Sequence, residues 1–71
     1  MMHPLVQRFI EVLTDDVKKW EQAAATVDKL IRHVPQLDRE KLAETATEYR
    51  ERAEYFKSLI EQVKEDPGNR D

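Results

Sequence analysis

The chain has 71 residues, of which 39% are hydrophobic and 38% charged, with no cysteine and a formal net charge of −3 at pH 7. This length allows one domain at most, and the lack of cysteine excludes disulfides and thiolate zinc sites. The negative charge gives no overall attraction to nucleic acid or anionic lipid. No apolar run approaches the roughly 20 residues of a membrane span, and no signal peptide is visible, so we expect a cytoplasmic protein without membrane contact.

A regular apolar stripe in the first half predicts a helix over residues 4–33. Its members recur at alternating spacings of four and three: Val6, Ile10, Leu13, Val17, Trp20, Ala24, Val27, Ile31 and Val34. Pro4 suits a first helical turn, and Pro35 ends the helix because it disfavours helical geometry at the residue before it. Thr14 and the two aspartates after it could instead cap a new helix. Because the stripe crosses this point without a phase break, we prefer one continuous helix.

A bend over residues 34–37 is expected to lead into a second helix over residues 38–65 and a frayed tail over residues 66–71. Asp38 is the predicted N-cap of this helix, and Pro67 and Gly68 follow its end. The second half repeats the stripe with the same spacings: Leu42, Ala46, Tyr49, Ala53, Phe56, Ile60 and Val63.

The two stripes fit each other when the halves are paired antiparallel. The numbers of any two facing residues then add up to 73. Large residues face small ones in this pairing, as Trp20 faces Ala53 and Tyr49 faces Ala24. Such complementarity is what a packed helical seam requires. The sequence therefore predicts one all-α domain, an antiparallel two-helix hairpin of the coiled-coil type, which dimerises into a four-helix bundle.

The dimer is expected because one flank of the seam carries apolar residues that a single hairpin leaves uncovered. The predicted dimer interface consists of Phe9, Asp16, Ala23, Leu30, Arg52 and Leu59. Asp16 and Arg52 on this flank could form an ordinary ion pair at the rim or a polar contact between subunits that sets their register. On the opposite, polar flank, Glu21 can pair with Arg50. Leu5, Val12 and Tyr55 lie further round and are expected to contact an unidentified protein partner.

No pattern in the sequence indicates an enzyme, a cofactor or a metal centre. His3 and His33 lie near opposite ends of the hairpin, and no His-x-x-x-His or Glu-x-x-His spacing supplies a ligand set. We therefore assign no catalytic, cofactor-binding or metal-binding residue. Candidate nucleic-acid contacts are the basic residues at mid-helix and near the bend: Lys18, Lys19, Arg32 and Arg39.

The segment LDREKLAETATEYRERAEYFKSLIEQVKEDPG resembles the bend and second helix of the Rop family of plasmid copy-number regulators. The shared features are Leu-Asp at the bend, small residues at Ala46 and Ala53, and an acidic tail that contains glycine. This resemblance implies an antiparallel dimer of helical hairpins that binds paired RNA loops through its first helices.

Glu48-Tyr49, Arg52-Ala53-Glu54 and Lys57 are also similar to the last helix of microtubule-interacting-and-transport (MIT) domains. That family implies a three-helix domain that binds peptide helices in a groove, which here requires a helix break at Thr14. From the sequence we expect a small, non-enzymatic protein-interaction module, an adaptor or regulator, acting as a homodimer. A Rop-like nucleic-acid-binding regulator and an MIT-like peptide-binding domain are the alternatives.

Overall fold

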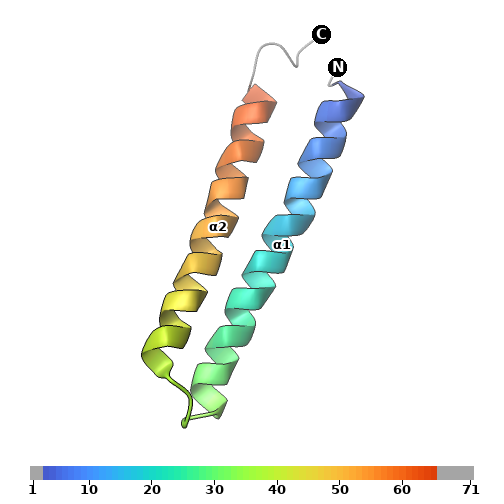
Figure 1. Cartoon of the computed structure of the whole chain (residues 1–71). Coiled ribbons are helices and arrows are strands. Elements are labelled where there is room, and N and C mark those ends of the chain that lie inside the picture. The colour runs from blue at the N-terminus through green and yellow to red at the C-terminus, as the bar shows by residue number, and fades with distance from the viewer. Residues whose placement is uncertain (1–2, 66–71) are drawn as a thin grey trace.

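The computed structural model describes residues 3–65 and shows two long helices that lie side by side and antiparallel (Figure 1). Helix α1 comprises Pro4–His33 and helix α2 comprises Arg39–Glu65. The residues that the structure describes contain no strand. The predicted all-α hairpin is therefore confirmed, whereas the predicted frayed tail, residues 66–71, lies outside the described residues.

Local hydrogen bonds explain where α1 begins and ends. The backbone N–H of Leu5 donates to Nδ1 of His3 at 3.0 Å, so His3 is the N-cap and Pro4 takes the first helical position. At the other end, Val34 leaves helical geometry, with φ −128° and ψ 79°, ahead of Pro35. Its N–H still donates to the carbonyl of Leu30 at 2.9 Å, which closes the last turn.

Helix α1 passes through Thr14 without a break. The Thr14 hydroxyl donates to the carbonyl of Ile10, one turn earlier, at 2.7 Å. A threonine bonded backwards in this way lies within a helix, whereas a cap accepts hydrogen bonds from residues that follow it. Asp38 makes that second kind of contact: its Oδ1 accepts the N–H of Lys41 at 3.1 Å, as expected of the N-cap of α2.

The core is one layer of side chains between the two helices. Its buried members come from both stripes: Leu13, Val17, Ala24, Val27, Ala46, Ala53 and Ile60. The three alanines are only 1–2% exposed, so the backbones approach closely where the partner helix supplies a larger side chain. The molecule is long and thin, 55 × 14 × 11 Å, with a radius of gyration of 16.2 Å, against roughly 11 Å for a compact domain of this length.

Candidate interaction surface

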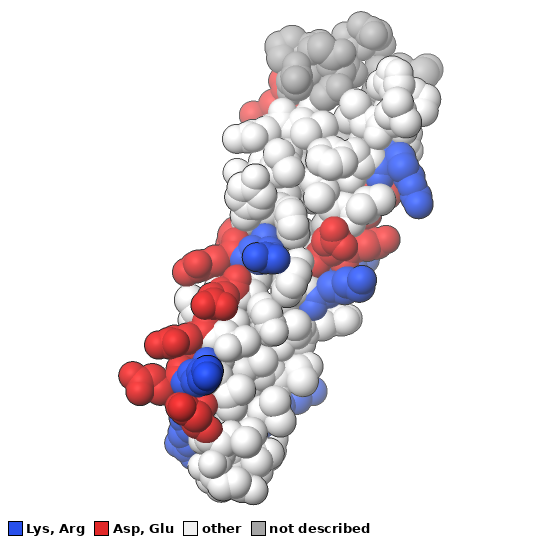
Figure 2. Space-filling view, viewed as in Figure 1, with Lys and Arg blue, Asp and Glu red and all other residues white. Residues whose placement is uncertain are grey.

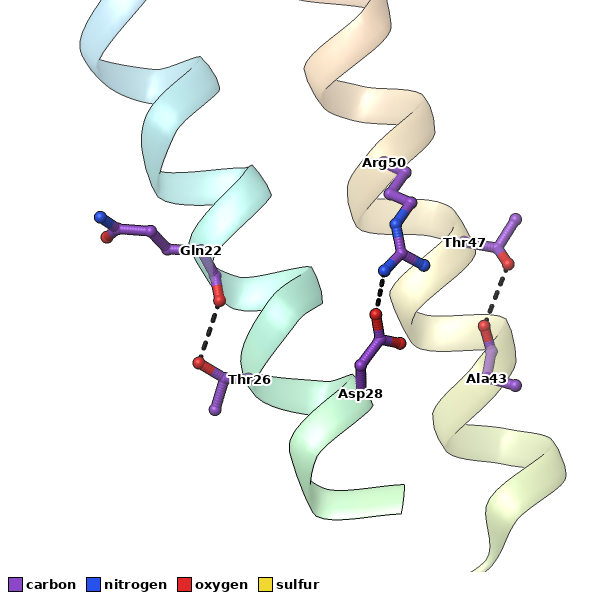
Figure 3. Close-up of polar contacts among 6 residues, drawn as sticks. All are labelled: Gln22, Thr26, Asp28, Ala43, Thr47 and Arg50. Carbon is purple, nitrogen blue, oxygen red and sulfur yellow. Dashed lines mark hydrogen bonds and ion pairs between the residues drawn. The ribbon is translucent and has the colours of Figure 1, made fainter. Parts of the chain in front are cut away.

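Two ion pairs join the helices along one flank of the seam, and Figure 3 shows one of them, between Arg50 and Asp28. The Nζ of Lys57 lies 3.0 Å from Oε2 of Glu21, and the Arg50 guanidinium pairs with the Asp28 carboxylate one heptad closer to the bend. We call these four residues the polar flank. The predicted pair between Glu21 and Arg50 is wrong, because each of these residues bonds to a different partner.

The direction of helical side chains explains why Glu21 and Arg50 do not pair with each other. Side chains tilt toward the N-terminus of their own helix. Arg50 therefore reaches toward the bend and meets Asp28, whose side chain tilts back toward it. Glu21 tilts away from the bend, where it meets Lys57. Glu21 and Arg50 tilt apart, although their Cα atoms lie near the same level of the seam.

The ion pairs of the polar flank affect the protonation of Lys57. The hydrogen bonds that it donates to Glu21, and secondarily to Glu54, raise the pKa of the Lys57 ammonium above its ordinary value of 10.5. Lys57 and both carboxylates are well exposed, so solvent screens these interactions. The polar flank is thus compatible with exposure to water.

We call the opposite flank the open flank. On this side, no ion pair within residues 3–65 joins the two helices. Residues three, four and seven apart lie on one side of a helix, so the predicted dimer-interface and partner-surface residues form one surface rather than two. The open flank consists of Leu5, Phe9, Val12, Asp16, Ala23, Leu30, Arg52, Tyr55 and Leu59. Leu5 is 74% exposed, Tyr55 65% and Val12 43%. Figure 2 shows this side of the molecule, with uncharged surface across both helices in the half that carries the chain ends.

Three aromatic residues of the seam lie at its edge. Trp20, Tyr49 and Phe56 are half-buried rather than fully enclosed, although the predicted seam places all three between the helices. The rings of Trp20 and Tyr49 are tilted by 43°, with centroids 5.3 Å apart.

Two hollows of about 430 Å³ each open beside the indole of Trp20. One is lined by Asp16, Lys19, Trp20, Ala23 and Phe56, and the other by Trp20, Glu48, Tyr49, Glu51 and Arg52.

Arg52 contacts Trp20 rather than Asp16. Its guanidinium carbon lies 5.0 Å from the centroid of the indole ring, a cation–π geometry. Within residues 3–65, Asp16 and Arg52 form no ion pair, because the two side chains tilt in opposite directions along the hairpin. Sequence reasoning missed the contact with Trp20, although Arg52 lies beside Ala53, which faces the indole across the seam.

The candidate nucleic-acid contacts do not converge. Lys18, Lys19, Arg32 and Arg39 are all exposed. Lys19 and Arg32 are 13 residues apart on α1, which at 1.5 Å per residue is about 20 Å along the helix. In the described part of the chain, none of the four takes part in an ion pair. They lie in two groups, one at mid-helix and one near the bend, rather than in one continuous basic patch.

The described residues offer neither a metal-binding group nor a membrane-spanning helix. His3 and His33 lie at opposite ends of α1. No group of three or more histidine or carboxylate side chains within residues 3–65 could hold a metal ion. Neither described helix is long and apolar enough to cross a bilayer.

Comparison of the chain with protein-family models, curated proteins and solved structures finds no match in any of the three. The two-helix hairpin is compatible with the helical-hairpin resemblance noted in the sequence. A relationship with the Rop family is a hypothesis that no comparison supports.

Proposed function

We propose that this protein is a small non-enzymatic interaction module that associates with a second copy of itself through the open flank. The observation that carries the proposal is the asymmetry of the hairpin. Ion pairs close one flank, whereas Leu5, Phe9, Val12 and Tyr55 are between 42% and 74% exposed on the other. Exposed apolar surface of this extent marks interaction sites on soluble proteins.

The size of the surface supports a second hairpin as the partner. The broad face of the molecule measures 55 Å by 14 Å, about 770 Å². A stable protein interface buries roughly 800 Å² on each partner. A second hairpin has the same length and shape, so it covers this face from end to end and encloses Trp20, Tyr49 and Phe56 in a four-helix bundle.

A pair of charge variants tests the proposal. Val12→Glu places a carboxylate on the open flank without touching the seam, because Val12 is already 43% exposed in the hairpin. Gln22→Glu adds the same charge on the outer side of α1 and serves as the control. Sedimentation equilibrium should give twice the chain mass of 8.4 kDa for the unmodified protein and for Gln22→Glu. Val12→Glu should give a mass close to that of one chain.

Two results would count against the proposal. A monomeric unmodified protein would show that a second copy does not cover the flank, and an undisturbed Val12→Glu dimer would place the interface elsewhere. Helical circular dichroism of Val12→Glu must match that of the control. This condition ensures that a change in mass reports association and not unfolding.

The two alternative functions, an MIT-like peptide-binding domain and a Rop-like regulator, predict a different number of helices or a different dependence on salt. An MIT-like domain has three helices, whereas α1 continues through Thr14 and the described residues form two. A Rop-like regulator would bind RNA through Lys18, Lys19, Arg32 or Arg39, with an affinity that falls by roughly 0.7–0.9 log units per phosphate contact for each decade of salt. Dimerisation through the open flank should be far less sensitive to salt.

A further inference from the structure

One of the two hollows beside Trp20 combines aromatic rings with carboxylates. Its volume is about 430 Å³, and it is lined by Trp20, Glu48, Tyr49, Glu51 and Arg52. Trp20 belongs to α1 and the other four residues to α2, so the hollow is built by both helices. Figure 2 shows that acidic side chains gather over the bend half of α2, the half that carries Glu48 and Glu51. We call this site the aromatic hollow.

The indole of Trp20 already holds one cation. The guanidinium carbon of Arg52 lies 5.0 Å from the centroid of the ring. Glu48 precedes Arg52 by four residues, a spacing at which opposite charges on a helix can pair. Within residues 3–65, however, no ion pair joins them. The guanidinium therefore lies on the ring face although a carboxylate is within reach, which marks this face as a seat for a flat cation.

The carboxylates of the aromatic hollow have no basic partner. In the described part of the chain, neither Glu48 nor Glu51 takes part in an ion pair. Two carboxylates and the single guanidinium of Arg52 give the hollow a net charge of −1. A cation that enters the hollow is therefore attracted by the carboxylates and finds aromatic faces on which to stack.

We infer that the aromatic hollow binds the side chain of an arginine from a partner protein. A guanidinium is planar, stacks on aromatic rings and donates paired hydrogen bonds to a carboxylate, so it uses both kinds of group that line the hollow. A lysine ammonium is a compact, strongly hydrated charge that matches flat rings less well.

The inference depends on the single hairpin and goes beyond the proposed dimer. A second copy on the open flank covers Trp20 and Tyr49, so the arginine and the second copy compete for the same rings. A partner protein that brings an arginine into the hollow therefore shifts the dimer toward single chains, because a ligand favours the state that it binds.

Fluorescence of Trp20, the single tryptophan of the sequence, reports binding in the whole chain. The probe is N-acetyl-arginine methylamide, and the control is the corresponding citrulline derivative, which has nearly the same shape and no charge. The arginine derivative should change the fluorescence to a saturating value, whereas the citrulline derivative should leave it unchanged. Equal responses to the two compounds would overturn the inference.

Charge variants locate the binding. Glu48→Gln combined with Glu51→Gln removes both carboxylates of the hollow and should weaken binding at least about twofold, as expected from the loss of two exposed ion pairs. Glu61→Gln combined with Glu65→Gln removes the same charge from the chain-end half of α2 and should leave the affinity nearly unchanged. Arg52→Gln should tighten binding, because it removes the cation that already lies over the indole.

Helical circular dichroism of these variants must match that of the unmodified protein, so that the affinities compare folded hairpins. An equal loss of affinity in the two double variants, or no gain in Arg52→Gln, would overturn the arginine site. Val12→Glu separates the site from the dimer, because this variant should bind the probe at least as tightly as the unmodified protein. Weaker binding by Val12→Glu would overturn the competition with a second copy. A monomeric unmodified protein with the same affinity as Val12→Glu would overturn the dimer and support the arginine site.

Discussion

Replacing Ala46 with leucine tests the register of the seam. Ala46 is 1% exposed and lies level with Val27, which is 8% exposed, so the three added carbons have no free volume to occupy. Overpacking of this kind typically costs about 1–3 kcal/mol. Ala43, three residues earlier on the same helix, is exposed, and the same substitution there should change stability by less than about 0.5 kcal/mol.

Urea unfolding, followed by circular dichroism at equal protein concentrations, measures the difference. For a chain this small, roughly 1 kcal/mol of stability is lost per molar urea, so Ala46→Leu should lower the midpoint by about 1–3 M. Ala43→Leu should leave the midpoint nearly unchanged. The equal concentrations matter because association shifts apparent stability. Equal midpoints for the two variants, or a larger loss at Ala43, would refute the register.

Three further predictions concern the core, the caps and the polar flank. Trp20→Ala should cost about 3 kcal/mol in denaturant melts through lost packing and ring contacts, and a near-neutral result would mean that the indole does not anchor the seam. Asp38→Ala should cost about 1 kcal/mol, whereas Thr14→Ala should change stability by less than about 0.5 kcal/mol; equal losses would indicate a helix start at Thr14. The raised pKa of Lys57 means that its pairing with Glu21 stabilises the fold below pH 10.5 and that this contribution disappears as pH rises through the folded-state pKa. The stability difference between the unmodified protein and Lys57→Met should therefore shrink in strongly alkaline buffer, and a difference that stays constant with pH would contradict the ion pair.

The helices and their pairing could be predicted from the sequence because they depend on periodicity and local chemistry. The stripe from Val6 to Val34 defines one face of a helix, Pro4 and Pro35 bracket it, and Asp38 caps the next helix. Each of these signals depends on residues within one or two helical turns of each other. The sequence of this chain is therefore enough to recognise them. The same stripes also placed the small residues of the seam opposite the large ones.

Contacts between long polar side chains could not be predicted in the same way. The pairing of Glu21 with Lys57 instead of Arg50 depends on side-chain tilt, which displaces the charged ends of facing residues by more than one helical turn. The position of Arg52 over Trp20 depends on how far the indole leans out of the seam. Residue spacing in the sequence specifies neither quantity.

The most direct measurement of whether a second copy covers the open flank is hydroxyl-radical footprinting across a range of protein concentrations. Tyr55 is 65% exposed in the hairpin and lies on the open flank, whereas Leu37 is 40% exposed and lies in the bend outside the flank. The proposed dimer predicts that oxidation of Tyr55 falls as concentration rises, while oxidation of Leu37 stays constant. Oxidation of Tyr55 that is fast and independent of concentration would contradict the account.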